Sequence, residues 1–410
     1  MYEKKGTIFF RLLIFVCLLP FIKIIVHMVL GNYQMITVAA FPIALIVVYF
    51  LNTTRNVFVI NNKYLWFVSY IFAKAISDVI IGDSTLVSSF SSSVRFGYLV
   101  LGSAFAVSFV ISNKIAKKIF DISFAFFCIT VLIGCSQAFS WLPLHNIFTN
   151  YGGNLMSATV LGNSRVNGGV GGTVIGYSCY IVLNAMVFAF GENYYSKKQK
   201  IAYLIGIISA AILNYSRATF VGLLIFFVGY LVFYKMKTVN IGYKLLLVIC
   251  VVCVVGWYCT TDNEMVRYIF VNDQYRQVSD ATRISSTIRG LQAMNTPKKL
   301  LFGVSTGQNT GFTTTGKSQT DGAFVAFIVD YGFCGIILYL LFFASLFFNI
   351  IKFDYINNKK GIIATAVFTV LLLSGINSGL FENVNMLFFP FWVATMVAFC
   401  KGGCDDERRN

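Results

Sequence analysis

The chain has 410 residues, of which 57% are hydrophobic and only 12% are charged, and its formal net charge is +16. A soluble domain carries about 25% charged residues, so this composition excludes soluble enzymes, nucleic-acid binders and secreted disulfide scaffolds. The ten cysteines are scattered through apolar runs, and Cys250 and Cys253 lack a second pair that would complete a zinc site. The composition predicts an all-α, polytopic integral membrane protein.

Twelve apolar segments approach the length of about 17 to 25 residues that a helix needs to cross a bilayer. We expect spans near residues 8–30, 35–51, 64–81, 94–112, 119–140, 170–191, 201–215, 218–234, 244–260, 322–350, 361–378 and 385–400. The first segment lacks a small-residue cleavage site, which indicates a span rather than a signal peptide. Only Ser216 and Arg217 separate the seventh and eighth spans.

The basic residues orient these spans. With the N-terminus in the cytoplasm, 20 of the 32 lysines and arginines fall in short cytoplasmic stretches, as the positive-inside rule requires. Both chain ends are then cytoplasmic, and the net charge reflects membrane topology rather than binding to nucleic acid. We expect residues 1–410 to form a single transmembrane domain.

Most of the remaining cations lie in two long outer segments, 141–169 and 261–320. The second segment contains seven cations and four acidic residues, which leaves a net charge of +3. Cations on the outer face oppose the positive-inside rule, so a ligand is the simplest reason for their presence. We expect the two segments to cap a site for an anion.

Residues 311–318 fit the phosphate-loop pattern GxxxxGK[ST]. That loop binds nucleotide only between a strand and a helix of a soluble domain, whereas this copy lies in an outer loop beside a membrane span. We do not expect nucleotide hydrolysis. A glycine-rich turn next to Lys317 would still suit a phosphate group.

Four arginines are candidates for binding a phosphate group. Arg217 interrupts an apolar stretch at an outer membrane boundary, where a charge is costly unless it is paired or functional. Its guanidinium group could bind a phosphate or simply reach the lipid headgroups. Arg165 lies in the glycine-rich stretch 152–176, which could approach a ligand closely or pack helices together. Arg283 and Arg289 flank a helical pattern of apolar residues that suits an interfacial helix, and a solvated charged rim is the alternative.

Two acidic residues are candidates for a general base. Asp321 begins the tenth span, and Glu382 lies in a short outer turn; either could accept a proton or neutralise an arginine. Asp78 lies one helical turn after Lys74, so we expect these two to neutralise each other. With only two histidines and no clustered carboxylates, the chain offers no evident catalytic metal ligands.

Four motifs together resemble the Wzy-type O-antigen polymerase family and the related O-antigen ligases. They are the Ser-Arg-Ala-Thr-Phe start of a span at 216–220, the Arg-Val-Asn-Gly element at 165–168, the stretch from Arg283 through Pro297 to Gly303 and Val304, and the Asp321 to Gly335 signature with Gly332. The similarity covers residues 160 to 385, and the order of the motifs matches that of the family.

The resemblance implies a GT-C-like fold and an inverting glycosyl transfer on the outer face of the bacterial plasma (inner) membrane. A growing glycan on undecaprenyl diphosphate would be the donor, and a repeat unit on the same lipid would be the acceptor. Arg217 and Arg283, then Arg165 and Arg289, would bind the diphosphate, and Asp321 or Glu382 would accept the hydroxyl proton. The resemblance implies no metal, no cofactor and no nucleic acid, but a partner that regulates chain length.

Two other activities compete with polymerisation. Ligases of this kind place a histidine where Asp321 stands, and the second half of this chain has none, which favours a polymerase. A flippase for lipid-linked oligosaccharides would also suit twelve helices. Many carriers contain matching internal repeats, whereas the long segment 261–320 has no counterpart in the first half. The product could be O-antigen, capsule or exopolysaccharide.

Overall fold

The computed structural model describes about half of the chain. The described residues are 62–86, 88–90, 93–94, 96–97, 113–151, 159–160, 163–164, 166–169, 174–214, 216–231, 284–285, 287–306 and 323–352, with the single residues 25, 28, 29, 242, 249 and 253. Apart from isolated residues, the predicted spans 8–30, 35–51, 94–112, 244–260, 361–378 and 385–400 lie outside this part.

The described part is helical except for one short β pair. The helices are α3 (Asn62–Ile81), α5 (Asn113–Ala138), α6 (His145–Tyr151), α7 (Val174–Gly191), the 3-10 helix η1 (Glu192–Tyr194), α8 (Lys197–Asn214), α9 (Arg217–Tyr230), α13 (Pro297–Phe302) and α14 (Ala323–Lys352). Strands β1 (Thr159–Val160) and β2 (Asn163–Ser164) pair antiparallel, with Thr159 opposite Ser164.

Six of the predicted spans are confirmed as helices. Helices α3, α5, α7, α8, α9 and α14 correspond to the segments predicted at 64–81, 119–140, 170–191, 201–215, 218–234 and 322–350. The division between α8 and α9 is real, because Ser216 has an extended backbone (φ −108°, ψ 132°) and cannot continue a helix. The described residues of segment 141–169, which the charge pattern predicts on the outer face, include α6 and the β pair.

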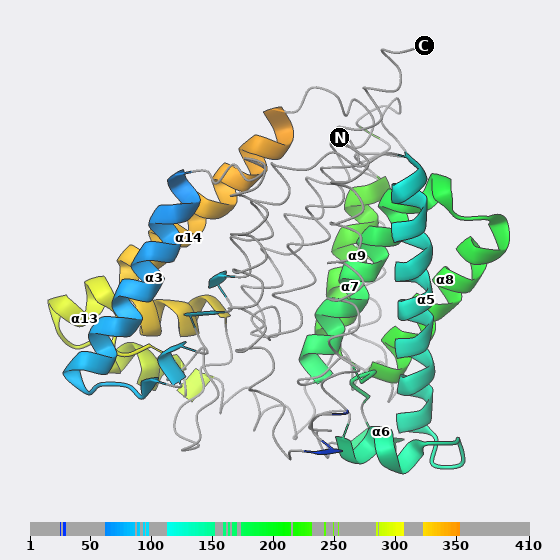
Figure 1. The fold of residues 1–410 in the computed structure, drawn as a ribbon, viewed down its shortest axis with the longest axis horizontal. Helices are drawn as coiled ribbons and strands as arrows, with labels where there is room; N and C mark the ends of the chain where they lie inside the picture. Colours follow the sequence, from blue (N-terminus) through cyan, green and yellow to red (C-terminus); the bar gives the residue numbers. More distant parts are fainter. Residues whose placement is uncertain are drawn as a thin grey trace.

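Helices α5 to α9 form one bundle, drawn in cyan to green in Figure 1. Helices that follow one another in the chain run in opposite directions, as contacts at the two ends of the bundle show, whereas α5 runs parallel to α8 and α7 runs parallel to α9. At one end the Tyr195 hydroxyl after α7 donates to the carbonyl of Phe120 at the start of α5 (3.4 Å). At the other end the backbone N–H of Val166, before α7, donates to the carbonyl of Leu213 at the end of α8 (3.4 Å).

Helices α3, α13 and α14 form a second group, at the left of Figure 1. Helix α3 runs antiparallel to α14: the rings of Phe67 and Phe342 stack with centroids 5.4 Å apart, and the Tyr70 hydroxyl donates to the Tyr331 carbonyl (2.6 Å). Figure 1 places the C-terminal end of α3 and helix α6 toward the lower side of the view, and helix α13 at the left margin beside the α3/α14 pair. These are all segments that the charge pattern predicts on the outer face.

Two features of the described helices favour a membrane-embedded protein. Residues Lys117–Ala138 and Phe327–Ser345 are long and apolar enough to cross a bilayer. Helix α8 buries Tyr203, Ile207 and Ala211 but exposes Ile205 (59%), Ile208 (58%) and Ile212 (47%) on its other side. A helix that is apolar all round is either buried in protein or surrounded by lipid. The coarse prediction of a helical protein that associates with a membrane therefore agrees with this structure.

Candidate functional site

A buried carboxamide at the end of α5 organises the segment that precedes α7. The Gln137 side-chain oxygen accepts the backbone N–H groups of Asn167 (3.1 Å) and Gly168 (3.0 Å). Its amide nitrogen donates to the Phe148 carbonyl of α6 (3.0 Å) and to the Asn167 side-chain oxygen (2.6 Å). One glutamine thus holds α6 and residues 167–168 against α5. We call Gln137, Asn167 and their partners the Gln137 centre.

A second buried amide fastens the same segment to the junction of α8 and α9. Asn214 is fully buried, and its side-chain nitrogen donates to the Val166 carbonyl (3.2 Å). Its oxygen accepts the hydroxyl groups of Ser178 in α7 (2.8 Å) and Thr219 in α9 (2.7 Å). Four pieces of chain therefore meet at one side chain. Neutral amides suit this role because they donate and accept together without the cost of burying a charge.

The two amide contacts bring two predicted arginine motifs to one place. Val166 directly follows Arg165, and Asn214 lies three residues before Arg217. Arg217 is itself the first residue of α9. Helix N-termini favour anions because their N–H groups and the helix dipole point outward. Residues 166–168, which follow Arg165 in the chain, and the start of α9 are therefore both held by Asn214 at the predicted outer end of the bundle.

The other two motif elements also contact each other. Gly303, at the end of α13, and Gly332, within α14, both have positive φ angles (84° and 68°). A Cβ atom on Gly303 would collide with the backbone of Asp330 and Tyr331, and one on Gly332 would collide with the Leu301 carbonyl. The Val304 N–H donates to the Val329 carbonyl (2.7 Å) across this crossing. Glycine is required at both positions because two backbones touch there.

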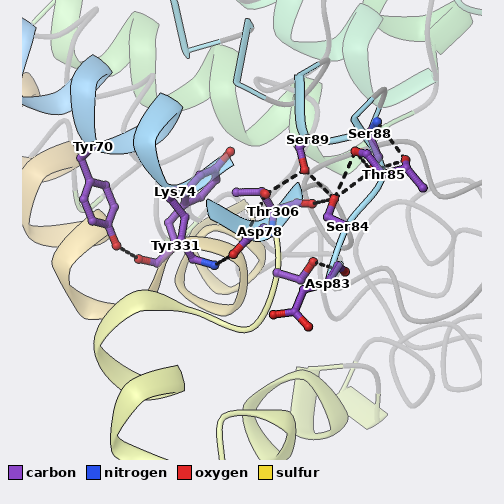
Figure 2. Close-up of polar contacts among 11 residues, drawn as sticks. Tyr70, Lys74, Asp78, Asp83, Ser84, Thr85, Ser88, Ser89, Thr306 and Tyr331 are labelled. Atoms are coloured by element: carbon purple, nitrogen blue, oxygen red, sulfur yellow. Dashed lines mark hydrogen bonds and ion pairs between the residues drawn. The ribbon is translucent and has the colours of Figure 1, made fainter. Parts of the chain in front are cut away.

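A buried ion pair fixes the chain just after this crossing (Figure 2). Lys74 and Asp78 form the salt bridge that their spacing predicts. The other carboxylate oxygen of Asp78 accepts both the backbone N–H (2.7 Å) and the hydroxyl (2.8 Å) of Thr306. The Ser89 and Thr306 hydroxyl groups are 3.0 Å apart, and Ser84 donates to the Thr306 carbonyl (2.9 Å). We call this set the Asp78 centre.

The structure describes only part of the predicted site. Arg217 begins α9, and Arg289 is exposed, with its Nε donating to the Ser285 carbonyl (3.3 Å). Residues 287–293 are helical, and Ile284, Ile288 and Leu291 are 48–61% exposed, so the apolar stripe of the predicted interfacial helix is uncovered. Four predicted residues and the phosphate-loop match lie outside the described residues: Arg165, Arg283, Asp321, Glu382 and 311–318.

The opposite end of the bundle carries basic residues. Lys117 and Lys118 at the start of α5, and Lys197 and Lys198 at the start of α8, are all exposed there. Beside them, burial and the nearby Asp121 carboxylate raise the pKa of the Tyr195 phenol above its ordinary value, so this hydroxyl stays protonated as a donor. Among the described side chains, exposed lysines therefore gather at one end of the bundle, and the buried amides Gln137, Asn167 and Asn214 lie at the other.

Sequence reasoning did not identify Gln137, Asn167, Asn214 or Thr306 as site residues. Three of them carried a signal: Gln137 is a carboxamide inside an apolar run, and Asn167 and Asn214 belong to the stretches around Arg165 and Arg217. Thr306 carried none, because its partner Asp78 is 228 residues away. Within the described residues, no group of three or more His, Cys, Asp or Glu side chains could hold a metal ion.

Comparison with known proteins does not identify a relative. No protein-family model matches the chain, and no curated protein matches it significantly.

Proposed function

We propose that the protein is a polysaccharide polymerase that joins undecaprenyl-diphosphate-linked oligosaccharide repeat units on the outer face of the bacterial plasma membrane. In this proposal about twelve helices span the membrane in a GT-C-like arrangement, both termini are cytoplasmic, and segments 141–169 and 261–320 cap the active site. The proposal rests on the family resemblance of the motifs, and the contacts within each of the two pairs of motif segments support it.

One observation carries the proposal. The Asn214 amide hydrogen-bonds to Val166, so the residue after Arg165 is joined to the start of the Arg217 motif through a single buried side chain. These arginines are 52 residues apart in the chain. A diphosphate would account for two arginine motifs at one end of the bundle, because its two phosphates need several fixed positive groups.

The chemistry needs little else from the protein. The acceptor hydroxyl oxygen attacks the anomeric carbon of the donor, the bond between that carbon and the diphosphate oxygen breaks, and lipid diphosphate leaves with the bonding electrons. Arg217 and Arg283, with Arg165 and Arg289, would stabilise the charge that develops on the leaving group. The hydroxyl proton would pass to Asp321 or Glu382.

The charge distribution supports the proposed sidedness. Exposed lysines gather at the end of the α5–α9 bundle opposite the amide-rich end, and the positive-inside rule assigns such an end to the cytoplasm. The predicted arginine motifs then face outward, where a lipid-linked donor and acceptor meet after export.

Reconstitution tests the proposal directly. Purified protein in liposomes receives undecaprenyl-diphosphate-linked repeat units without nucleotide sugar, ATP or divalent metal, and the products are separated by size. We expect a ladder of repeats. Arg217→Ala should reduce the rate of chain growth at least about 100-fold, as the loss of one charge-stabilising donor does. Arg217→Lys should keep part of the rate, because it retains the charge but not the planar fork.

Lys198→Ala is the matched control, since it removes an exposed cation at the opposite end, and it should leave the ladder unchanged. A normal ladder from well-folded Arg217→Ala protein would contradict the diphosphate assignment. Movement of the repeat units across the bilayer without a ladder would identify a flippase. Transfer of a finished glycan to a different acceptor, without chain growth, would identify a ligase.

A further inference from the structure

Two buried polar atoms in the Gln137 centre have no hydrogen-bond partner. They are the side-chain nitrogen of Asn167 and the hydroxyl oxygen of Thr149. Asn167 as a whole is only 1% exposed. Both residues adjoin the Gln137 carboxamide: Asn167 bonds to it directly, and Thr149 follows Phe148, whose carbonyl accepts from it. An enclosed polar atom without a partner is costly. Here one such atom belongs to a direct partner of Gln137, and the other belongs to the residue that follows its second partner, Phe148.

The hydrogen-bond network determines which atom of Asn167 is unpaired. The backbone N–H groups of Asn167 and Gly168 must donate to an oxygen, so the Gln137 atom facing them is its oxygen. The other Gln137 atom is then the amide nitrogen, a donor to Asn167. Gly169 N–H donates to the same Asn167 atom (3.1 Å), so that atom is an oxygen. The unpaired Asn167 atom is therefore its NH₂ nitrogen, a donor.

The two unpaired groups select a hydroxyl over an anion. The Asn167 nitrogen only donates, whereas the Thr149 hydroxyl donates and accepts. Both groups could donate to an anion, but neither carries a positive charge that would stabilise one, so a neutral hydroxyl group, which also donates and accepts, is the better match. In the proposed function the arginines, which are charged, bind the diphosphate instead.

We propose that Asn167 Nδ2 and Thr149 Oγ1 form a neutral subsite that binds a saccharide hydroxyl group of the lipid-linked substrate. This inference rests on the proposed function, and it assigns the residues that distinguish the sugar from its lipid diphosphate. Thr149 belongs to α6, which is seven residues long. Hydrogen bonds from Gln137 to the Phe148 carbonyl (3.0 Å) and between His145 Nδ1 and the Ser136 carbonyl (2.6 Å) hold this helix to α5.

Thr149→Val is the decisive variant. Valine has nearly the shape of threonine, and the Thr149 hydroxyl has no hydrogen-bond partner to lose, so the folded protein should be as thermally stable as the wild type or more so. Binding of two probes is measured in micelles: an undecaprenyl-diphosphate-linked repeat unit, and undecaprenyl diphosphate without sugar. We expect affinity for the repeat-bearing lipid to fall about 5- to 10-fold, the effect of one lost hydrogen bond, and affinity for the bare lipid to stay unchanged.

Thr130→Val is the matched control. It makes the same substitution in α5, but the Thr130 hydroxyl donates to the Phe127 carbonyl of its own helix (2.8 Å), so neither affinity should change. Asn167→Asp supplies a second variant, because it keeps the oxygen that accepts from Gly169 and Gln137 and removes the donor. It should weaken binding of the repeat-bearing lipid at least as much as Thr149→Val does.

Three outcomes would overturn the subsite. Lower thermal stability of Thr149→Val with unchanged affinity would mean that an ordered water occupies the centre. Equal loss for both lipids would mean that the sugar is not recognised there, and no loss for either would mean that nothing binds. Wild-type protein that binds the repeat unit but forms no ladder would reject the polymerase while leaving the binding comparison intact. Wild-type protein that binds neither lipid would reject both.

Discussion

The Asp78 centre and the Gln137 centre do the same mechanical task with different chemistry. Each joins segments far apart in the chain at one end of a helical group. The Asp78 centre uses a buried ion pair, and both carboxylate oxygens have partners. The Gln137 centre uses neutral amides and leaves two polar atoms without partners. Because both oxygens of Asp78 have partners, we interpret the Asp78 centre as purely structural. The unpaired atoms of Asn167 and Thr149 could instead bind a ligand.

The largest effect should come from the glycine crossing beside the Asp78 centre. Gly332→Ala places a methyl group on the Leu301 carbonyl at a residue with φ 68°, so we expect a loss of more than about 4 kcal/mol and little folded protein. Gly82→Ala is the matched control: Gly82 has φ 84° but no atom within 4 Å of the added Cβ. It should cost only about 1–2 kcal/mol, the strain of a left-handed residue.

Thermal melting of both alanine variants in detergent measures this difference. Equal stability of the two variants would show that φ strain alone matters and that the backbones of α13 and α14 do not touch as described.

A smaller effect should come from breaking the buried ion pair. Asp78→Asn leaves the Lys74 ammonium group without its partner and weakens the anchor of Thr306, so we expect a loss of about 3–5 kcal/mol. Lys74→Met combined with Asp78→Asn should recover part of this loss, because no uncompensated charge remains. The free energy of unfolding in mixed micelles, measured for both single variants and the double variant, gives the coupling energy. Additive losses would contradict a direct ion pair.

The smallest of the three losses of stability should come from removing the buried amide of Asn214. Asn214→Ala leaves the Val166 carbonyl and the hydroxyls of Ser178 and Thr219 without their partner, for which we expect about 2–3 kcal/mol. Chain growth should slow as well, because the segment after Arg165 loses its attachment to the start of α9.

Asn184→Ala is the comparison for this variant. Asn184 is an equally buried asparagine of α7 that bonds to the Tyr180 carbonyl (2.9 Å) and the Tyr203 hydroxyl (3.0 Å), away from the arginine motifs. It should cost stability and leave chain growth normal. Equal chain growth in the two variants would show that the Asn214 contacts are not needed for the activity.

The local features of this protein were predictable from its sequence. Long apolar runs determine the positions of α3, α5, α7, α8, α9 and α14, and the Ser216–Arg217 interruption divides α8 from α9. The Lys74–Asp78 pair follows from helical spacing. These features depend on residues a few positions apart, so hydropathy and period are sufficient.

The tertiary structure alone decided which polar groups meet. Gly303 contacts the backbone beside Gly332, Thr306 bonds to Asp78 across 228 residues, and Asn214 reaches Val166 across 48. The unpaired nitrogen of Asn167 also became visible only when its neighbours were known. The physical reason is that a buried polar group must find its partner wherever packing brings one, and the partner's distance along the chain leaves no periodic trace in the sequence.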